Sequence, residues 1–486
     1  MCGIFGLIGQ SPAARRLVAG ASRLQNRGEQ TTRVVTFDGH YFHHHGGLGP
    51  ASLLFFQKDI TSLHGDCGVA HTRYATGGHL SPDMLMRNIQ PVFSERPGMA
   101  TASNGDLVNL VAATQRLKDK GFSFQTEVDA KVIQNSLVDR FAANEVHKAQ
   151  DTKDLSERLF KSVGDIHERL VGAYSCINLM ERGLLVFKDP HGIRPLCMAC
   201  RNDHSGQAVE WAFSSETSVF NYFGDYHKIR ELDAGEAVFV ERDTLRLFSK
   251  QITAAKPAFC FFEFVYFARP DSRLKGHVVE SVRERLGDVL ARENMGLRDR
   301  IDCVVGLPGT AVSTGNSFAK AMGAPVTRAV ITVGSKRSFQ ETSDEKRQRA
   351  IDDKFVFIRD FIEGKRIAII DDSNVRGTTG RKIVRRLLDL GAKEVHLFYY
   401  CPPIIGPCYY GIDTPDESKL IAVGKTLEQV RAEMGATTLN YISKRGLLEG
   451  LQMSEDELCL ACISRRYPTD TDDAKAKLHR RRNERR

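Results

Sequence analysis

Short apolar stretches separated by glycine-rich turns dominate the first 110 residues, a pattern typical of β-strands. Farther along, apolar positions spaced three and four residues apart predict helices at 107–117, 130–141 and 154–170. The expected strands lie at 2–8, 34–37, 68–74, 99–103, 174–179, 184–188, 208–214 and 236–242. This order predicts a mixed α+β domain that ends near residue 250.

The pattern changes after a connector at 251–258, because strands are now followed by helices. The expected elements are a strand at 303–306 and a helix at 311–322, a strand at 366–370 and a helix at 381–390, and a strand at 395–400. The apolar residues of the helix at 381–390 share one face, and Gly391 follows where a C-terminal cap belongs. The alternation predicts a parallel sheet with helices on its faces, an α/β domain.

Composition narrows the class of protein. The 486 residues are 42% hydrophobic and 26% charged, as in ordinary globular chains, and no long apolar run predicts a membrane span. Of the net charge of +8, the segment 475–486 supplies seven Lys or Arg and one Glu, or +6. We therefore expect a disordered basic tail at 469–486 and no nucleic-acid partner.

The missing basic stretch before Arg15 and the odd count of eleven cysteines favour a reducing, cytoplasmic location.

Cys2 is a candidate nucleophile. Removal of Met1 would leave its α-amine free to act as the general base for its own thiol. Taken alone, Cys2 could equally be a buried thiol of a first strand.

Four motifs in a fixed order favour the nucleophile. They are Met-Cys-Gly-Ile-Phe-Gly at 1–6, Leu-Gln-Asn-Arg-Gly at 24–28, His-Thr-Arg-Tyr-Ala-Thr at 71–76, and Ser-Asn-Gly-Asp-Leu-Val-Asn at 103–109. Together they resemble the glutaminase domain of class II glutamine amidotransferases, which implies an αββα domain with an N-terminal nucleophile. The resemblance implies that Asn104 and Gly105 stabilise an oxyanion, while Arg73 binds the carboxylate of glutamine and Asp129 its ammonium group. Without the motif order, Asn-Gly would be a simple turn and the two charges surface groups.

A second candidate site follows the apolar strand at 367–370. Asp371 and Asp372 come directly after it, and the loop continues as Ser-Asn-Val-Arg-Gly-Thr-Thr-Gly. Carboxylates at a strand's carboxyl end can hold ribose hydroxyls and, through Mg²⁺, a pyrophosphate. The loop and the following helix N-terminus offer donors to a phosphate. A lone Asp-Asp pair would be only a polar turn, but the complete run favours a phosphate site.

This run resembles the phosphoribosyl pyrophosphate (PRPP) signature of type I phosphoribosyltransferases, and flanking motifs at 262–272, 402–403 and 410–413 resemble those of the amidophosphoribosyltransferase family. The resemblance implies domains at 2–250 and 251–468, a homo-oligomer, and transfer of glutamine-derived ammonia, shielded from bulk water, to PRPP. The product would be 5-phosphoribosylamine, in the first committed step of purine synthesis. It implies that PRPP is bound by Asp371, Asp372, Ser373, Arg376, Gly377, Thr378, Thr379, Arg337 and Arg347, and Mg²⁺ by Thr310, Asp371 and Asp372.

Two loops differ from the family pattern and keep other functions open. The pyrophosphate loop is Pro-Gly-Thr-Ala at 308–311, and the closing loop at 331–339 has several changed residues. One alternative is a paralogous amidotransferase that delivers ammonia to a different phosphoribosyl or activated acceptor. The other is a PRPP sensor that binds nucleic acid through the basic tail.

Two Cys-x-x-Cys pairs could suggest one zinc site. Cys197 and Cys200 lie in a predicted strand, where residues three apart point to opposite faces, so we interpret them as core thiols. The second pair resembles the iron–sulfur subgroup of the family, which implies a [4Fe–4S] cluster on Cys260, Cys408, Cys459 and Cys462. Unligated thiols or zinc are the alternatives. The His run at 43–45 is expected to be exposed strand or turn, not a metal site.

Overall fold

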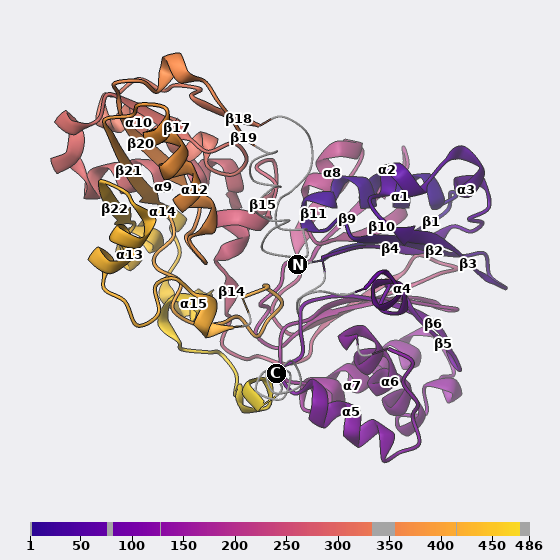
Figure 1. Ribbon diagram of the computed structural model, residues 1–486. Coiled ribbons are helices and arrows are strands. Elements are labelled where there is room, and N and C mark those ends of the chain that lie inside the picture. The colour runs from indigo at the N-terminus through magenta and orange to yellow at the C-terminus, as the bar shows by residue number, and fades with distance from the viewer. Residues whose placement is uncertain (1, 75–80, 127, 333–354, 415, 477–486) are drawn as a thin grey trace.

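The computed structural model describes residues 2–74, 81–126, 128–332, 355–414 and 416–476 and has two lobes (Figure 1). The first lobe is a sandwich of two antiparallel sheets. One sheet has the order β11-β9-β10-β1-β4-β2-β3. Its strands are β1 (Gly3–Gly9), β2 (Thr31–Phe37), β3 (Phe42–Leu48), β4 (Cys67–Arg73), β9 (Cys197–Asn202), β10 (Ala208–Ser214) and β11 (His227–Glu231).

The second sheet of the sandwich has the order β13-β12-β8-β7-β6-β5. Its strands are β5 (Val92–Glu95), β6 (Gly98–Asn104), β7 (Ser175–Met180), β8 (Gly183–Lys188), β12 (Glu236–Glu241) and β13 (Leu247–Gln251). The inner faces of the two sheets share one apolar core, which includes Ile4, Val69 and Ile177. Alternation of apolar residues along each strand builds this core, because successive side chains point to opposite faces.

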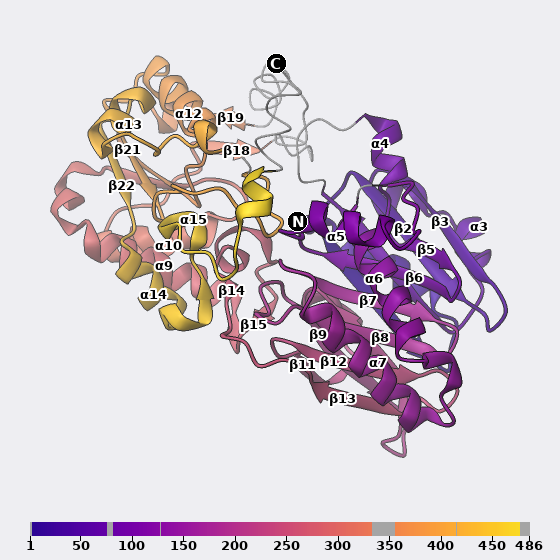
Figure 2. The same ribbon diagram turned by 90° about the horizontal axis from the view of Figure 1, so that it is seen from below.

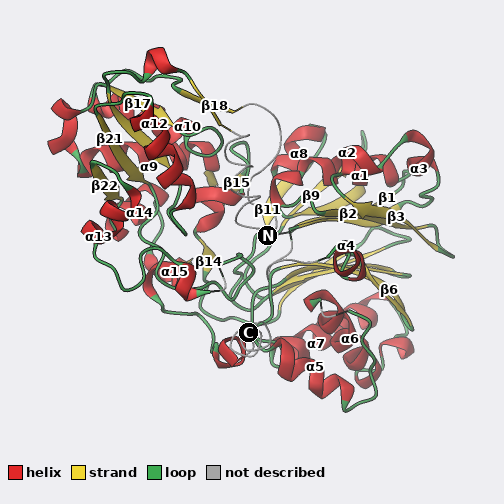
Figure 3. Ribbon diagram, in the orientation of Figure 1, coloured by secondary structure: helices red, strands yellow, loops and turns green. Residues whose placement is uncertain are grey.

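Helices cover both outer faces of the sandwich (Figure 3). One outer core joins helix α1 (Ala14–Arg23) and helix α8 (Ser218–Phe223) to the seven-stranded sheet. The other joins α5 (Leu110–Lys118), α6 (Asp129–Ala143) and α7 (Thr152–His167) to the six-stranded sheet. The smaller helices are α2 (Ala51–Leu54), α3 (Gln57–Thr61) and α4 (Pro82–Arg87). The lobe therefore has the four layers αββα.

The second lobe contains a parallel sheet of order β17-β20-β21-β22. Its strands are β17 (Cys303–Gly306), β20 (Arg366–Asp371), β21 (Glu394–Tyr399) and β22 (Thr438–Tyr441), and its helices are α9 (Val279–Glu293), α10 (Val312–Met322), α12 (Thr378–Asp389), α13 (Leu427–Met434) and α14 (Lys444–Leu451). Two antiparallel pairs flank them, β15 (Arg273–Leu274) with β16 (His277–Val278) and β18 (Val330–Thr332) with β19 (Phe355–Phe357). The predicted α/β alternation is confirmed, and Gly391, with φ +92°, follows α12.

The end of the chain returns to the junction between the lobes. Strand β23 (Leu458–Cys459) pairs in parallel with β14 (Phe259–Cys260), and helix α15 (Ala461–Ser464) follows. Strand β14 lies between the two lobes in Figures 1 and 2, whereas α15 lies with the second lobe in Figure 2. The tail was expected to be disordered from residue 469, but 472–476 are helical and the Thr469 and Tyr410 hydroxyls lie 2.9 Å apart. This first part of the tail is anchored because Tyr410 offers a buried polar partner.

The structure differs from the sequence-based predictions in two other places. Strand β13 continues to Gln251, so the connector begins one residue later than predicted. Helix α9 was not predicted, although its buried Val279, Val282, Leu286 and Val289 have helical spacing. No helix among the described residues has the length and apolar character needed to cross a membrane.

Candidate functional site

Cys2 lies at the start of β1, where the two sheets of the sandwich approach each other. Its backbone nitrogen donates to Asn104 Oδ1 at 3.2 Å, and its Sγ lies 3.9 Å from the backbone oxygen of Tyr74. Asn104 is the last residue of β6 and is fully buried. Its Nδ2 has no hydrogen-bond partner among the described residues. A buried donor held beside a thiol is suited to an oxyanion that forms only during reaction.

Gly105 follows Asn104 and has a backbone conformation that favours glycine. Its φ is +132°, and a Cβ atom there would lie 2.1 Å from the backbone oxygen of Ala173. The following turn is fixed by Asp129, the first residue of α6, whose Oδ2 accepts from the Leu107 backbone N–H at 2.6 Å. The Asn-Gly turn and Asp129 are therefore brought together.

Arg73 ends β4 and is almost completely buried. Its Nη1 donates to the backbone oxygen of Asn88, while its Nε has no partner among the described residues. A Cβ on Gly28 would lie 2.2 Å from the carbonyl carbon of Arg73, so the loop at 24–28 packs directly against this strand end. Cys2, Arg73, Asn104, Gly105 and Asp129 thus all lie at ends of elements at one edge of the sandwich.

Arg27 is a residue of this corner whose role the sequence did not reveal. Its Nε donates to the backbone oxygen of Cys2 at 2.9 Å. Its Nη atoms bind Glu216 at 2.8 Å and Glu263 at 2.9 Å, and all three side chains are fully buried. Burial lowers the pKa of the Arg27 guanidinium, but Glu263 and Glu216 outweigh it and raise that pKa overall. Arg27 therefore stays charged and links the nucleophile to the second lobe.

A signal for this link is present in the sequence. Glu263 is the one acidic residue in the apolar run 259–267, and it begins a π-helical turn, η3 (Glu263–Phe267). A carboxylate within such a run must be buried and hence paired. Its partners are Arg27 and, at 3.5 Å, Arg194, both distant in sequence.

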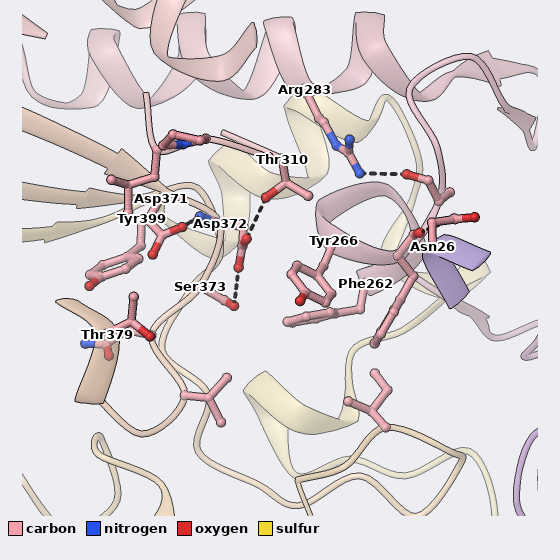
Figure 4. A pocket seen from close by; sticks show the side chains of 18 of the residues that line it. Asn26, Phe262, Tyr266, Arg283, Thr310, Asp371, Asp372, Ser373, Thr379 and Tyr399 are labelled. Atoms are coloured by element: carbon pink, nitrogen blue, oxygen red, sulfur yellow. Dashed lines mark hydrogen bonds between the residues drawn. The ribbon is translucent and has the colours of Figure 1, made fainter. Parts of the chain in front are cut away.

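The PRPP-like loop lies at the carboxyl end of β20. Asp372 Oδ2 accepts from the Thr310 hydroxyl at 2.6 Å, and Oδ1 accepts from the Ser373 hydroxyl at 2.7 Å (Figure 4). Thr310 comes from the loop after β17, the neighbour of β20, so the sheet order explains this contact. Asp371 Oδ1 accepts the Asp372 N–H at 2.9 Å. Gly377, with φ +74°, turns the chain into α12.

One cavity of about 710 Å³ joins this loop to the first lobe. On one side it is lined by the predicted ligands Thr310, Asp371, Asp372, Ser373, Arg376, Gly377, Thr378 and Thr379. On the other side it reaches Asn26, Gly28 and Tyr74, beside the nucleophile. Tyr266 and Phe262 project into the space between (Figure 4). Arg337 and Arg347, also predicted to bind PRPP, lie outside the described residues.

The four candidate cluster ligands line a separate small cavity at the junction of the lobes. The β14–β23 pairing sets Cys260 opposite Cys459, while the backbone N–H groups of Ile405 and Gly406 bind the Cys462 carbonyl oxygen. Cys408 Sγ accepts the Tyr410 backbone N–H at 3.4 Å. Burial raises the pKa of the Cys260 thiol to about 11.

The remaining cysteine and histidine motifs carry no such arrangement. Cys197 and Cys200 are fully buried in β9, as expected of core thiols, and His43–His45 form part of edge strand β3. In the described part of the chain, no three His, Cys, Asp or Glu side chains are placed to hold one metal ion.

Comparison with known proteins places the chain in a family. A model of the glutamine amidotransferase domain matches residues 78–221. Amidophosphoribosyltransferase from Bacillus subtilis is 34% identical over 96% of this chain and 94% of its own length, and that from Methanothermobacter thermautotrophicus is 34% identical over the same shares. The chain belongs to the amidophosphoribosyltransferase family.

A solved structure agrees with this family over nearly the whole fold. Glutamine PRPP amidotransferase from B. subtilis, complexed with ADP and GMP, matches with a TM-score of 0.82 and 32% identity over 97% of this chain and 98% of that one. The amidophosphoribosyltransferase likeness therefore covers the sandwich lobe and the parallel-sheet lobe together.

Proposed function

We propose that this chain makes 5-phosphoribosylamine from PRPP, glutamine and water, releasing glutamate and pyrophosphate, the first committed step of purine synthesis. Membership of the amidophosphoribosyltransferase family supports the proposal. The observation that carries it is the cavity that joins Gly28 and Tyr74 to the loop at 371–380. Tyr74 lines this cavity and its backbone oxygen lies 3.9 Å from Cys2 Sγ, which supports a path for ammonia between the two sites.

At the first site, the Cys2 thiolate attacks the amide carbon of glutamine, and the N-terminal amine takes the thiol proton. Asn104 Nδ2 and the Gly105 N–H stabilise the oxyanion. Collapse breaks the carbon–nitrogen bond, releases ammonia and leaves a thioester that water hydrolyses to glutamate. Arg73 and Asp129 hold the α-carboxylate and α-ammonium groups of the substrate.

At the second site, ammonia attacks C1 of PRPP while the bond from C1 to the pyrophosphate oxygen breaks. Asp371 and Asp372 hold the ribose hydroxyls, and Ser373, Gly377, Thr378 and Thr379 surround the 5′-phosphate. Mg²⁺ would enter with the pyrophosphate, near Asp371, Asp372 and Thr310, and neutralise its charge. Phe262 and Tyr266 exclude water from the path between the sites.

The test measures glutamate and pyrophosphate together. PRPP should stimulate glutamine hydrolysis, Mg²⁺ should be required, and the two products should form in equal amounts. Glutaminase activity that ignores PRPP would contradict the proposal. It would favour a paralogous amidotransferase with another acceptor, a function suggested by the missing acidic residue in the loop 308–311.

We also propose that Cys260, Cys408, Cys459 and Cys462 hold a [4Fe–4S] cluster, which when bound would supply a covalent anchor for the C-terminal segment. The small cavity that they share and the N–H···S bond to Cys408 support this. A cubane needs its sulfur ligands farther apart than one ion does, so the absence of a single-ion site in the described residues is compatible. Anaerobically purified protein should contain iron and acid-labile sulfide; zinc or neither metal would contradict the cluster.

A reducing cytoplasmic location and a homo-oligomeric state complete the proposal. All eleven cysteines are free, which supports the location. Sedimentation equilibrium of the purified protein tests the oligomeric state, and a mass of one chain would contradict it.

A further inference from the structure

Arg194 connects the four-cysteine cavity with the nucleophile corner. It lies in the sandwich lobe, between β8 and β9, and is fully buried. Its side chain lines the small cavity together with all four cysteines. Burial of an unpaired guanidinium costs free energy, so neighbouring groups must compensate its positive charge.

Hydrogen bonds fix the guanidinium on one side only. Nε donates to the Tyr410 backbone oxygen at 2.8 Å, and Nη2 donates to the same oxygen. The N–H of that residue binds Cys408 Sγ, so Arg194 supports a candidate ligand through one residue's backbone. In contrast, Nη1 is buried with no hydrogen-bond partner among the described residues, 3.5 Å from Glu263 Oε1.

The charges of the buried network balance without any group in the cavity. Arg27 and Arg194 carry two positive charges, and Glu216 and Glu263 carry two negative ones. Four thiolates around an iron–sulfur core would add net negative charge at the edge of this network. Among the residues that line the cavity, Arg194 is the one cation, and its Nη1 makes no hydrogen bond to the described residues.

We infer that Arg194 is the positioning and charge-compensating residue of the iron–sulfur group, and that it couples this group through Glu263 and Arg27 to the backbone of Cys2. The inference rests on the proposed cluster. Net charge and hydrogen bonds near a cluster set its reduction potential. Removing the positive charge should therefore make the cluster harder to reduce, and removing the negative charge of Glu263 should make it easier to reduce.

The experiment compares the cluster midpoint potential in four variants of the full-length protein, purified without air. Arg194→Gln should shift the potential to more negative values, Glu263→Gln to more positive values, and Arg194→Lys should stay close to the parent. Arg242→Gln is the matched control, because Arg242 pairs with Asp66 in the sandwich lobe and does not line the cavity. Opposite shifts cannot come from loosened packing alone.

The outcomes separate the inference from the cluster proposal. Parent protein without iron would overturn both. Parent protein with iron, and equal potentials in Arg194→Gln, Glu263→Gln and the control, would overturn the inference alone. If Arg194→Gln does not fold, the other two variants still test the inference. It predicts a positive shift of the midpoint potential in Glu263→Gln and a parent-like potential in Arg194→Lys. A negative or absent shift in Glu263→Gln would refute the inference.

Discussion

The nucleophile corner and the PRPP-like loop use charge in opposite ways. Around Cys2, Arg27 is enclosed by Glu216 and Glu263, and none of the three side chains is accessible. Around β20, Asp372 accepts from the Thr310 and Ser373 hydroxyls and faces a cavity of about 710 Å³. The first set of charges fixes geometry, whereas the second is held ready for a cationic or hydroxyl-bearing ligand.

The largest expected effect separates the two regions by chemistry. Cys2→Ala should lower glutamine-dependent product formation by at least roughly 10³-fold, because the attacking sulfur is lost. Activity with added ammonium should remain, since the PRPP-like loop is untouched. Steady-state assays with each nitrogen source check this, with Cys200→Ala as a buried-thiol control. Retained use of glutamine by Cys2→Ala would refute the assigned nucleophile.

Arg27→Met tests whether the corner's charges are structural. The change leaves two buried carboxylates with too few cations, and breaking a buried pair costs about 3–5 kcal/mol. Urea unfolding should show this loss in the free energy of unfolding, and Arg242→Met, at a partly exposed ion pair, should cost about 1 kcal/mol or less. Equal losses of unfolding free energy in the two variants would show that the buried network stabilises the protein no more than the partly exposed pair does.

Thr310→Val tests the hydrogen bond from Thr310 to Asp372 at the PRPP-like loop. The change removes one hydroxyl donor to Asp372 while keeping the shape of the side chain. A lost hydrogen bond to a charged group is worth about 1.5–3 kcal/mol, so the KM for PRPP should rise roughly tenfold or more. Thr310→Ser keeps the hydroxyl and should behave like the parent. An unchanged KM for PRPP in Thr310→Val would mean that the hydrogen bond from Thr310 to Asp372 does not contribute to PRPP binding.

The smallest effect concerns His71, which is buried in β4 near the nucleophile. Burial, and then Arg73, hold its pKa well below the ordinary value of 6.5. As pH falls below 6.5, the unfolded chain binds a proton that the folded chain does not, so the free energy of unfolding should fall. Well above pH 6.5 both states are unprotonated, so the contribution of His71 no longer changes with pH. His71→Gln should flatten this acid dependence in pH-resolved denaturant unfolding; an unchanged slope would contradict the assignment.

Local patterns in the sequence predicted the elements that carry the two sites. Cys2, Asn104 and Asp371 lie at ends of strands with clear apolar patterns, and their motifs have fixed spacing. The Arg27–Glu263 pair was missed because its partners are 236 residues apart, and no local pattern encodes which distant charges meet. Edge strand β3, half-exposed and rich in His and Gly, was anticipated only as strand or turn at 43–45, because it lacks the alternation of apolar residues that predicts a strand.

In the proposed reaction, the cavity that reaches Tyr74 beside Cys2 carries ammonia to PRPP. The most direct measurement supplies glutamine labelled with heavy nitrogen in its side-chain amide, together with excess unlabelled ammonium, and determines the label in trapped product. The product should keep the label of glutamine, because ammonia inside the cavity does not exchange with ammonium in solution. Label diluted to the ratio in solution would mean that ammonia leaves the protein, and would refute transfer through the cavity.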